Sequence, residues 1–131
     1  MDAEATIRAY YGALRSGEPL YPFFGAGEST VKFGIGERLT GYDEVRAGLR
    51  AQTETTEEWV VDSERLLAEE TDDHAWFADD VFMAWTDVDR DRRWEFDTRW
   101  SGTLQRRPDD ADLGTGWRFV GMHVSTAGAT D

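Results

Sequence analysis

Regular alternation of apolar and polar residues near the end of the chain most constrains how it can fold. Within residues 93–107, one set of alternate positions is mostly apolar and the other is polar or charged. The first set is Trp94, Phe96, Thr98, Trp100, Gly102 and Leu104, and the second is Glu95, Asp97, Arg99, Ser101, Thr103 and Gln105. Because successive side chains of a strand point to opposite faces, this pattern predicts a long strand with one buried face.

Three further runs in the second half of the chain have the composition of strands. They cover residues 58–69, 75–87 and 116–126, and turn signals lie at residues 71–73, 87–91 and 108–116. The last run is apolar on both faces, which is typical of a central strand. Its two faces are predicted to be Trp117, Phe119 and His123 against Val120, Met122 and Val124.

A helix is predicted to open the chain. Residues 2–16 carry an apolar stripe at helical spacing, with Asp2 placed to cap the start and Gly17 to end the helix. The stripe consists of Ile7, Tyr10, Tyr11 and Leu14. This helix has one face to bury, and the strands that follow are the surface available to cover it.

The segment between the first helix and the strands contains a second predicted helix. Residues 40–43 resemble a capping box ahead of a helix that continues to about Thr53. An aromatic turn is predicted at residues 19–24 and a short strand at residues 30–35. The order of elements predicts an α+β fold in one domain over residues 1–131, with a curved antiparallel sheet wrapped round the first helix.

The charge of the chain narrows the choice of partners. The formal net charge is −13 and the pI is near 4.4, so binding to nucleic acid or to an anionic membrane is not expected. Lys32 is the only lysine among 14 basic residues, which leaves thirteen arginines. An acidic surface with almost no lysine predicts a halophilic source, since concentrated salt screens self-repulsion. The acidic start and the lack of an apolar run predict a cytoplasmic protein.

Four segments resemble the SnoaL-like domains of the nuclear-transport-factor-2-like superfamily. They are residues 7–14 with Gly17, residues 41–46, residues 99–107 and residues 116–125. The closing His123-Val124-Ser125 is also similar to the end of the calcium/calmodulin-dependent kinase II association domain. The resemblance implies a cone-shaped, cystatin-like α+β barrel with a cavity at its wide end. It further implies homodimers that form through the sheet.

Ketosteroid isomerase, another member of this superfamily, provides a test for inherited chemistry. Its oxyanion-hole tyrosine falls on Tyr10, which could donate a hydrogen bond to a developing enolate. The family's catalytic base would lie near Lys32 or Phe33, and its second aspartate near Gly102, where this chain has no carboxylate. Because base catalysis needs a base within reach, inheritance of the isomerase mechanism is not expected.

The candidate site residues combine an aromatic wall with polar groups. We expect a pocket for a small hydrophobic or aromatic molecule, with His123 as polar anchor and Ser125 beside it on the same face. The expected wall is Tyr10, Trp59, Trp76 and Trp100. Two alternatives stay open: a lyase or isomerase that uses His123 as acid or base with Tyr10 as oxyanion donor, and a structural dimerisation module.

Metal and cofactor motifs do not match. Residues 87–98 begin like a calcium loop but have Arg92 and Thr98 at the positions that require glycine and glutamate. Two histidines and no cysteine leave no zinc site, and no glycine-rich nucleotide motif is present. We therefore expect neither a metal nor a cofactor, and whether the chain is an enzyme stays undecided at this point.

Overall fold

A curved mixed sheet dominates the computed structural model, which describes residues 1–107 and 113–127. Seven strands are found within these residues, in the order β2-β1-β7-β6-β5-β3, with β4 also beside β5. The strands are β1 (Val31–Gly34), β2 (Glu37–Thr40), β3 (Thr56–Ser63), β4 (Leu67–Glu70), β5 (His74–Asp87), β6 (Arg92–Arg106) and β7 (Trp117–Thr126). Neighbouring strands are antiparallel except β1 and β7, which run parallel. The predicted α+β class with a sheet curved round the first helix is confirmed. The prediction of a purely antiparallel sheet is wrong, because β1 pairs in parallel with β7.

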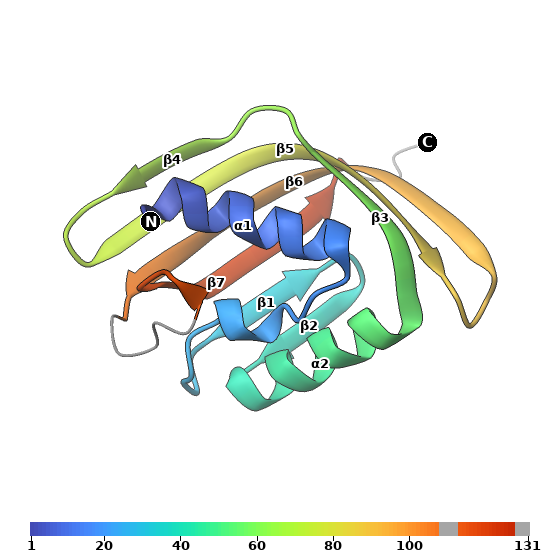
Figure 1. The fold of residues 1–131 in the computed structure, drawn as a ribbon, viewed down its shortest axis with the longest axis horizontal. Helices are drawn as coiled ribbons and strands as arrows, with labels where there is room; N and C mark the ends of the chain where they lie inside the picture. The colour runs from blue at the N-terminus through green and yellow to red at the C-terminus, as the bar shows by residue number, and fades with distance from the viewer. Residues whose placement is uncertain (108–112, 128–131) are drawn as a thin grey trace.

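Helix α1 (Ala3–Ser16) lies across the concave side of this sheet (Figure 1). The side chain of Asp2 accepts the backbone N–H of Ala5 at 2.8 Å, which caps the first turn. Gly17 ends the helix at φ 69°, a left-handed conformation in which glycine carries no Cβ penalty. The predicted apolar stripe is buried, and both predicted helix ends are confirmed.

The 3₁₀ turn η1 (Tyr21–Phe23) and helix α2 (Tyr42–Thr55) pack beside the β1–β2 hairpin. The capping box predicted at residues 40–43 does not form, because Gly41 is the N-cap of α2 and has no side chain. Instead, Glu44 accepts the backbone N–H of Thr40 at 3.0 Å. Thr40 lies one residue before the cap and belongs to β2, a strand that was not predicted.

The run predicted as one strand at residues 58–69 is two strands, β3 and β4. Both pair with β5, at different positions along its length. The backbone N–H of Glu64, between the two strands, donates to the carbonyl of Asp80 at 2.8 Å. The runs 75–87, 93–107 and 116–126 are confirmed as strands, while the turn predicted at residues 108–116 lies partly outside the described residues.

Strand β6 buries the face that its alternation predicts. Thr98, Trp100 and Leu104 are buried, while the charged positions of the opposite face are exposed. Along the paired strand β5, Ala75 and Phe77 are buried in the same way. These side chains meet α1 and form the core.

No helix in the described part of the chain has the length and apolar character needed to cross a membrane.

Strand β7 contains an irregularity that changes the predicted faces. Leu104 pairs with Phe119, but the preceding residue Thr103 pairs with Gly121, so Val120 is an extra residue in β7. A bulge of this kind shifts the alternation by one position. Met122 therefore points to the core, and His123 is exposed on the outer face. The predicted grouping of His123 with Trp117 and Phe119 is not observed for this reason.

Candidate functional site

A cavity of about 130 Å³ lies between α1, the β1–β2 hairpin, the end of α2 and the inner face of the sheet. Its lining combines aromatic and aliphatic side chains with a few polar ones. The aromatic side chains are Tyr10, Trp59, Trp85 and Trp100, and the polar ones are Lys32, Glu37, Gln52 and Thr56. An apolar cavity with a few convergent polar groups is typical of a small-molecule site.

The hairpin brings a partly buried ion pair into this cavity. Nζ of Lys32 donates a hydrogen bond to Oε1 of Glu37, and the two side chains are 7% and 32% exposed. Gly34 lies opposite Glu37 in the register. A Cβ atom at Gly34 would lie 2.6 Å from Oε1 of Glu37. The absence of a side chain at Gly34 thus lets the Glu37 carboxylate reach across the hairpin to Lys32.

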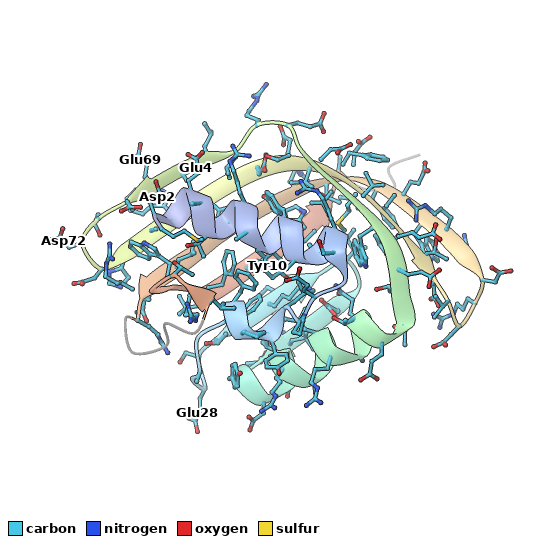
Figure 2. The ribbon with its side chains drawn as sticks, viewed as in Figure 1. Asp2, Glu4, Tyr10, Glu28, Glu69 and Asp72 are labelled. Carbon is cyan, nitrogen blue, oxygen red and sulfur yellow. The ribbon has the colours of Figure 1, made fainter. Side chains whose placement is uncertain are left out.

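Tyr10 contributes a hydroxyl group to the same cavity. Figure 2 shows Tyr10 on the side of α1 that faces η1 and the hairpin. Its ring packs edge-on against Phe23 and Phe119, with centroids 5.5 and 5.2 Å away. Burial, and then the negative charge of Glu37, raise the pKa of Tyr10 well above its usual value. The group is therefore a neutral hydrogen-bond donor, and none of the described residues hydrogen-bonds with its hydroxyl.

The neighbouring Tyr11 is held by a separate buried network. Its hydroxyl donates to Oδ2 of Asp79 at 2.9 Å, and Ser63 donates to the same oxygen at 2.6 Å. The backbone N–H of Arg65 donates to Oδ1 of Asp79 at 2.9 Å. Burial and the adjacent Asp79 carboxylate raise the pKa of Tyr11. This network ties α1 to β3 and β5, and so fixes the helix turn that carries Tyr10.

The structure brings together three of the six predicted site residues. Tyr10, Trp59 and Trp100 line the cavity. Trp76 is 52% exposed, since it alternates on β5 with the buried Ala75 and Phe77.

His123 and Ser125 border a shallow groove on the outer face of the sheet, where the ring of His123 contacts Phe33 with centroids 5.8 Å apart. The bulge in β7 places both side chains on this outer face, because it shifts the alternation of the strand by one position. Because His123 and Tyr10 lie on opposite sides of the sheet, they do not share the cavity that the predicted acid–base pair needs.

The cavity residues that were not predicted from the sequence include Lys32, Glu37 and Trp85. Lys32 was considered only as a failed match to the family's catalytic base. The available signal was its rarity, since it is the only lysine and lies between the apolar Val31 and Phe33 in a predicted strand. No feature of the sequence singled out Glu37. Its contact with Lys32 depends on the β1–β2 hairpin, which the residue pattern did not predict.

The cavity offers hydrogen-bond donors and one carboxylate in a partly desolvated space. The Lys32 ammonium and the Tyr10 hydroxyl are donors that suit a carbonyl or carboxylate oxygen. Glu37 is an acceptor and can also receive a proton. No group of three or more potential metal ligands was found among residues 1–107 and 113–127.

The described fold is a curved sheet with α1 across its concave side and a cavity between α1, the sheet and the β1–β2 hairpin. The sequence profile of the SnoaL-like domain matches residues 3–129. The chain therefore belongs to the SnoaL-like domain family.

Comparison with solved structures shows the same fold in nuclear-transport-factor-2-like proteins. A superfamily protein from Salmonella enterica serovar Typhimurium is 16% identical, with a TM-score of 0.78, over 97% of this chain and 89% of that one. A ketosteroid isomerase-like protein from Erwinia carotovora atroseptica is 15% identical, with a TM-score of 0.72, over 96% and 94%.

A protein from Xanthomonas campestris, described provisionally as a calcium/calmodulin-dependent protein kinase II association domain, is 14% identical. Its TM-score is 0.72, over 94% of this chain and 84% of that one. A search of curated proteins found no significant match. At these identities the similarities establish the fold alone.

Proposed function

We propose that the cavity binds a small organic molecule with an apolar body and a carbonyl or carboxylate oxygen. The observation that carries this proposal is the position of Lys32 and Tyr10, two donors that line one aromatic cavity. The oxygen of the ligand accepts from these donors, and the apolar body packs on Trp59 and Trp100. This assignment replaces His123 as the polar anchor.

The volume of the cavity limits the size of the ligand. At about 130 Å³ it is close to the roughly 150 Å³ engineered cavity that accepts benzene. A single ring or a short branched chain fits this space, whereas a four-ring steroid extends beyond it. Cyclic ketones, aromatic aldehydes and aromatic acids are therefore the ligands to test first.

Ligand-dependent thermal stabilisation tests the proposal, since a ligand that binds only the folded state raises its stability. We expect cyclohexanone, benzaldehyde or benzoate to raise the melting temperature, and toluene to raise it less. Lys32→Met and Tyr10→Phe should each weaken binding of the oxygen-bearing ligand by about ten-fold, equivalent to about 1.4 kcal/mol.

His123→Ala is the matched control, because His123 is exposed on the opposite face of the sheet. We expect this variant to bind the same ligands with unchanged affinity. If His123→Ala abolished binding while Lys32→Met and Tyr10→Phe retained it, the ligand would occupy the outer groove and the proposal would be wrong.

We also infer that two copies of the chain associate through the outer face of the sheet. Trp76 and Leu67 are exposed there, and exposed large apolar residues favour association. The outer groove contains Arg65 and Arg99 together with Asp80, so a two-fold contact can match basic with acidic groups.

Light scattering should give the mass of two chains, and Trp76→Glu should reduce the measured mass to that of one chain. A single-chain mass for the unmodified protein would contradict the inference.

A further inference from the structure

We propose that Lys32 forms an imine with a small aldehyde or ketone bound in the cavity, and that Glu37 receives the proton which the lysine must lose. This inference rests on the proposed function, because the carbonyl compound must first occupy the cavity. It goes further by assigning a covalent reaction to one nitrogen atom. The chemical class of the substrate is then a small carbonyl compound rather than a carboxylate.

The position of Lys32 satisfies the first requirement of this reaction, which is an amine that faces a bound carbonyl. The side chain is 7% exposed and lines the same cavity as Tyr10, Trp59, Trp85 and Trp100. Its Nζ is in direct contact with the carboxylate of Glu37. Imine formation needs the free amine, and the Glu37 carboxylate is the adjacent general base that can take the ammonium proton.

The choice of lysine at this position adds a second, independent observation. The chain uses arginine at every other basic position, thirteen times in all, and lysine only at this buried one. Arginine would pair with Glu37 at least as well, because its guanidinium can hold a carboxylate with two hydrogen bonds. Arginine does not lose its proton in proteins, whereas a lysine amine can become a nucleophile. A role limited to the ion pair does not account for this exception.

The reaction balances within the groups that line the cavity. The Lys32 ammonium transfers a proton to Glu37, and the free amine attacks the carbonyl carbon to form a C–N bond. The π electron pair of the carbonyl moves to oxygen, which gains a proton from the nitrogen by way of the Tyr10 hydroxyl. Glu37 then returns its proton to this hydroxyl as it leaves as water, and the nitrogen lone pair completes the C=N bond.

The product keeps the charge pattern of the starting state. Lys32 begins as an ammonium and ends as a protonated imine, and Glu37 is a carboxylate at both stages. The positive nitrogen therefore retains its partner in the partly buried site, where an unpaired charge would be costly. No oxidant, reductant or metal takes part in the reaction.

Reductive trapping tests the inference, and the single lysine makes the result simple to read. The full chain is incubated with cyclohexanone or benzaldehyde and sodium cyanoborohydride, which reduces a protonated imine to a stable amine. Mass spectrometry of the peptides then measures the adduct on Lys32 and on the α-amino group of the same chain. We expect Lys32 to be labelled at least about ten-fold faster, since a bound carbonyl is held next to its amine.

Two variants extend the test. Lys32→Arg keeps the positive charge and should lose the adduct at residue 32 while the α-amino group still reacts. Glu37→Gln removes the proton acceptor and should slow labelling of Lys32 by about 100-fold. Circular dichroism on both variants confirms that the fold is intact, and the comparison between the two amines of the unmodified chain needs no variant at all.

The outcomes separate this inference from the proposed function. If cyclohexanone raises the melting temperature but leaves Lys32 unlabelled, the imine is overturned and binding stands. If neither stabilisation nor an adduct is observed, both are overturned. Labelling of Lys32 no faster than the α-amino group, or labelling unaffected by Glu37→Gln, also overturns the inference.

Discussion

Replacing Gly102 with alanine should destabilise the fold by about 3 kcal/mol, because overpacking at a site enclosed by backbone has no easy relief. A Cβ atom at this position would lie 2.4 Å from the carbonyl oxygen of Gly121 and 2.8 Å from the ring of Phe77. The contact with Gly121 is to the backbone of the adjacent strand, so a change of rotamer cannot remove it. Urea denaturation measures the loss as a lower unfolding midpoint.

Gly12→Ala is the matched control for this substitution. Gly12 lies within α1, and a Cβ atom there would meet nothing within 4 Å. Alanine in a helix interior is favoured over glycine by about 0.5–1 kcal/mol, so this variant should be more stable. Two glycine-to-alanine changes are thus expected to shift the unfolding midpoint in opposite directions. If Gly102→Ala were neutral, the close approach of β6 and β7 at the bulge would be contradicted.

The second large effect is expected for Asp79→Ala, which should reduce the free energy of unfolding by about 3 kcal/mol. The variant leaves the buried Tyr11 hydroxyl, the Ser63 hydroxyl and the backbone N–H of Arg65 without their common acceptor. An unsatisfied buried donor loses its hydration without gaining a partner, which is why the cost is large. Chemical denaturation followed by tryptophan fluorescence measures the change.

Asp80→Ala provides the comparison, because it removes the same side chain from the next residue of β5. Asp80 is exposed, and surface substitutions of this kind are usually within about 0.5 kcal/mol. Equal losses for the two variants would mean that charge, and not the buried network, determines the effect. Asp79→Ala should also weaken ligand binding, since the network positions the helix turn that carries Tyr10.

The parts of the fold that could be predicted are those whose sequence signals act within a single helix or strand. Asp2 and Gly17 act on the ends of a single helix, and the alternation around Trp100 acts within a single strand. Both sets of expectations are confirmed. The hairpin strand β2 was not predicted, because four residues between two glycines have too little pattern to distinguish a strand from a turn.

The candidate site was predictable only in its aromatic part. Tyr10 was identified from its helix and from a family resemblance, and Trp100 from the alternation of its strand. His123 was misplaced relative to the cavity because one extra residue in β7 reverses which side chains point inward. Gly121 was the available warning, since an isolated glycine in a strand often marks a bulge. Without the partner strand, the pattern does not show where the shift occurs.

The amino-acid sequence by itself determined the order of both helices and the long strands, the buried faces of α1 and β6, and the acidic character of the chain. These properties follow from spacing and composition, which act over a few residues or over the whole chain. Only the tertiary structure decided that Lys32, Glu37 and Tyr10 line one cavity. Their meeting depends on how β1 and β2 pair and on where the sheet curves round α1, and these are contacts between segments far apart in the chain.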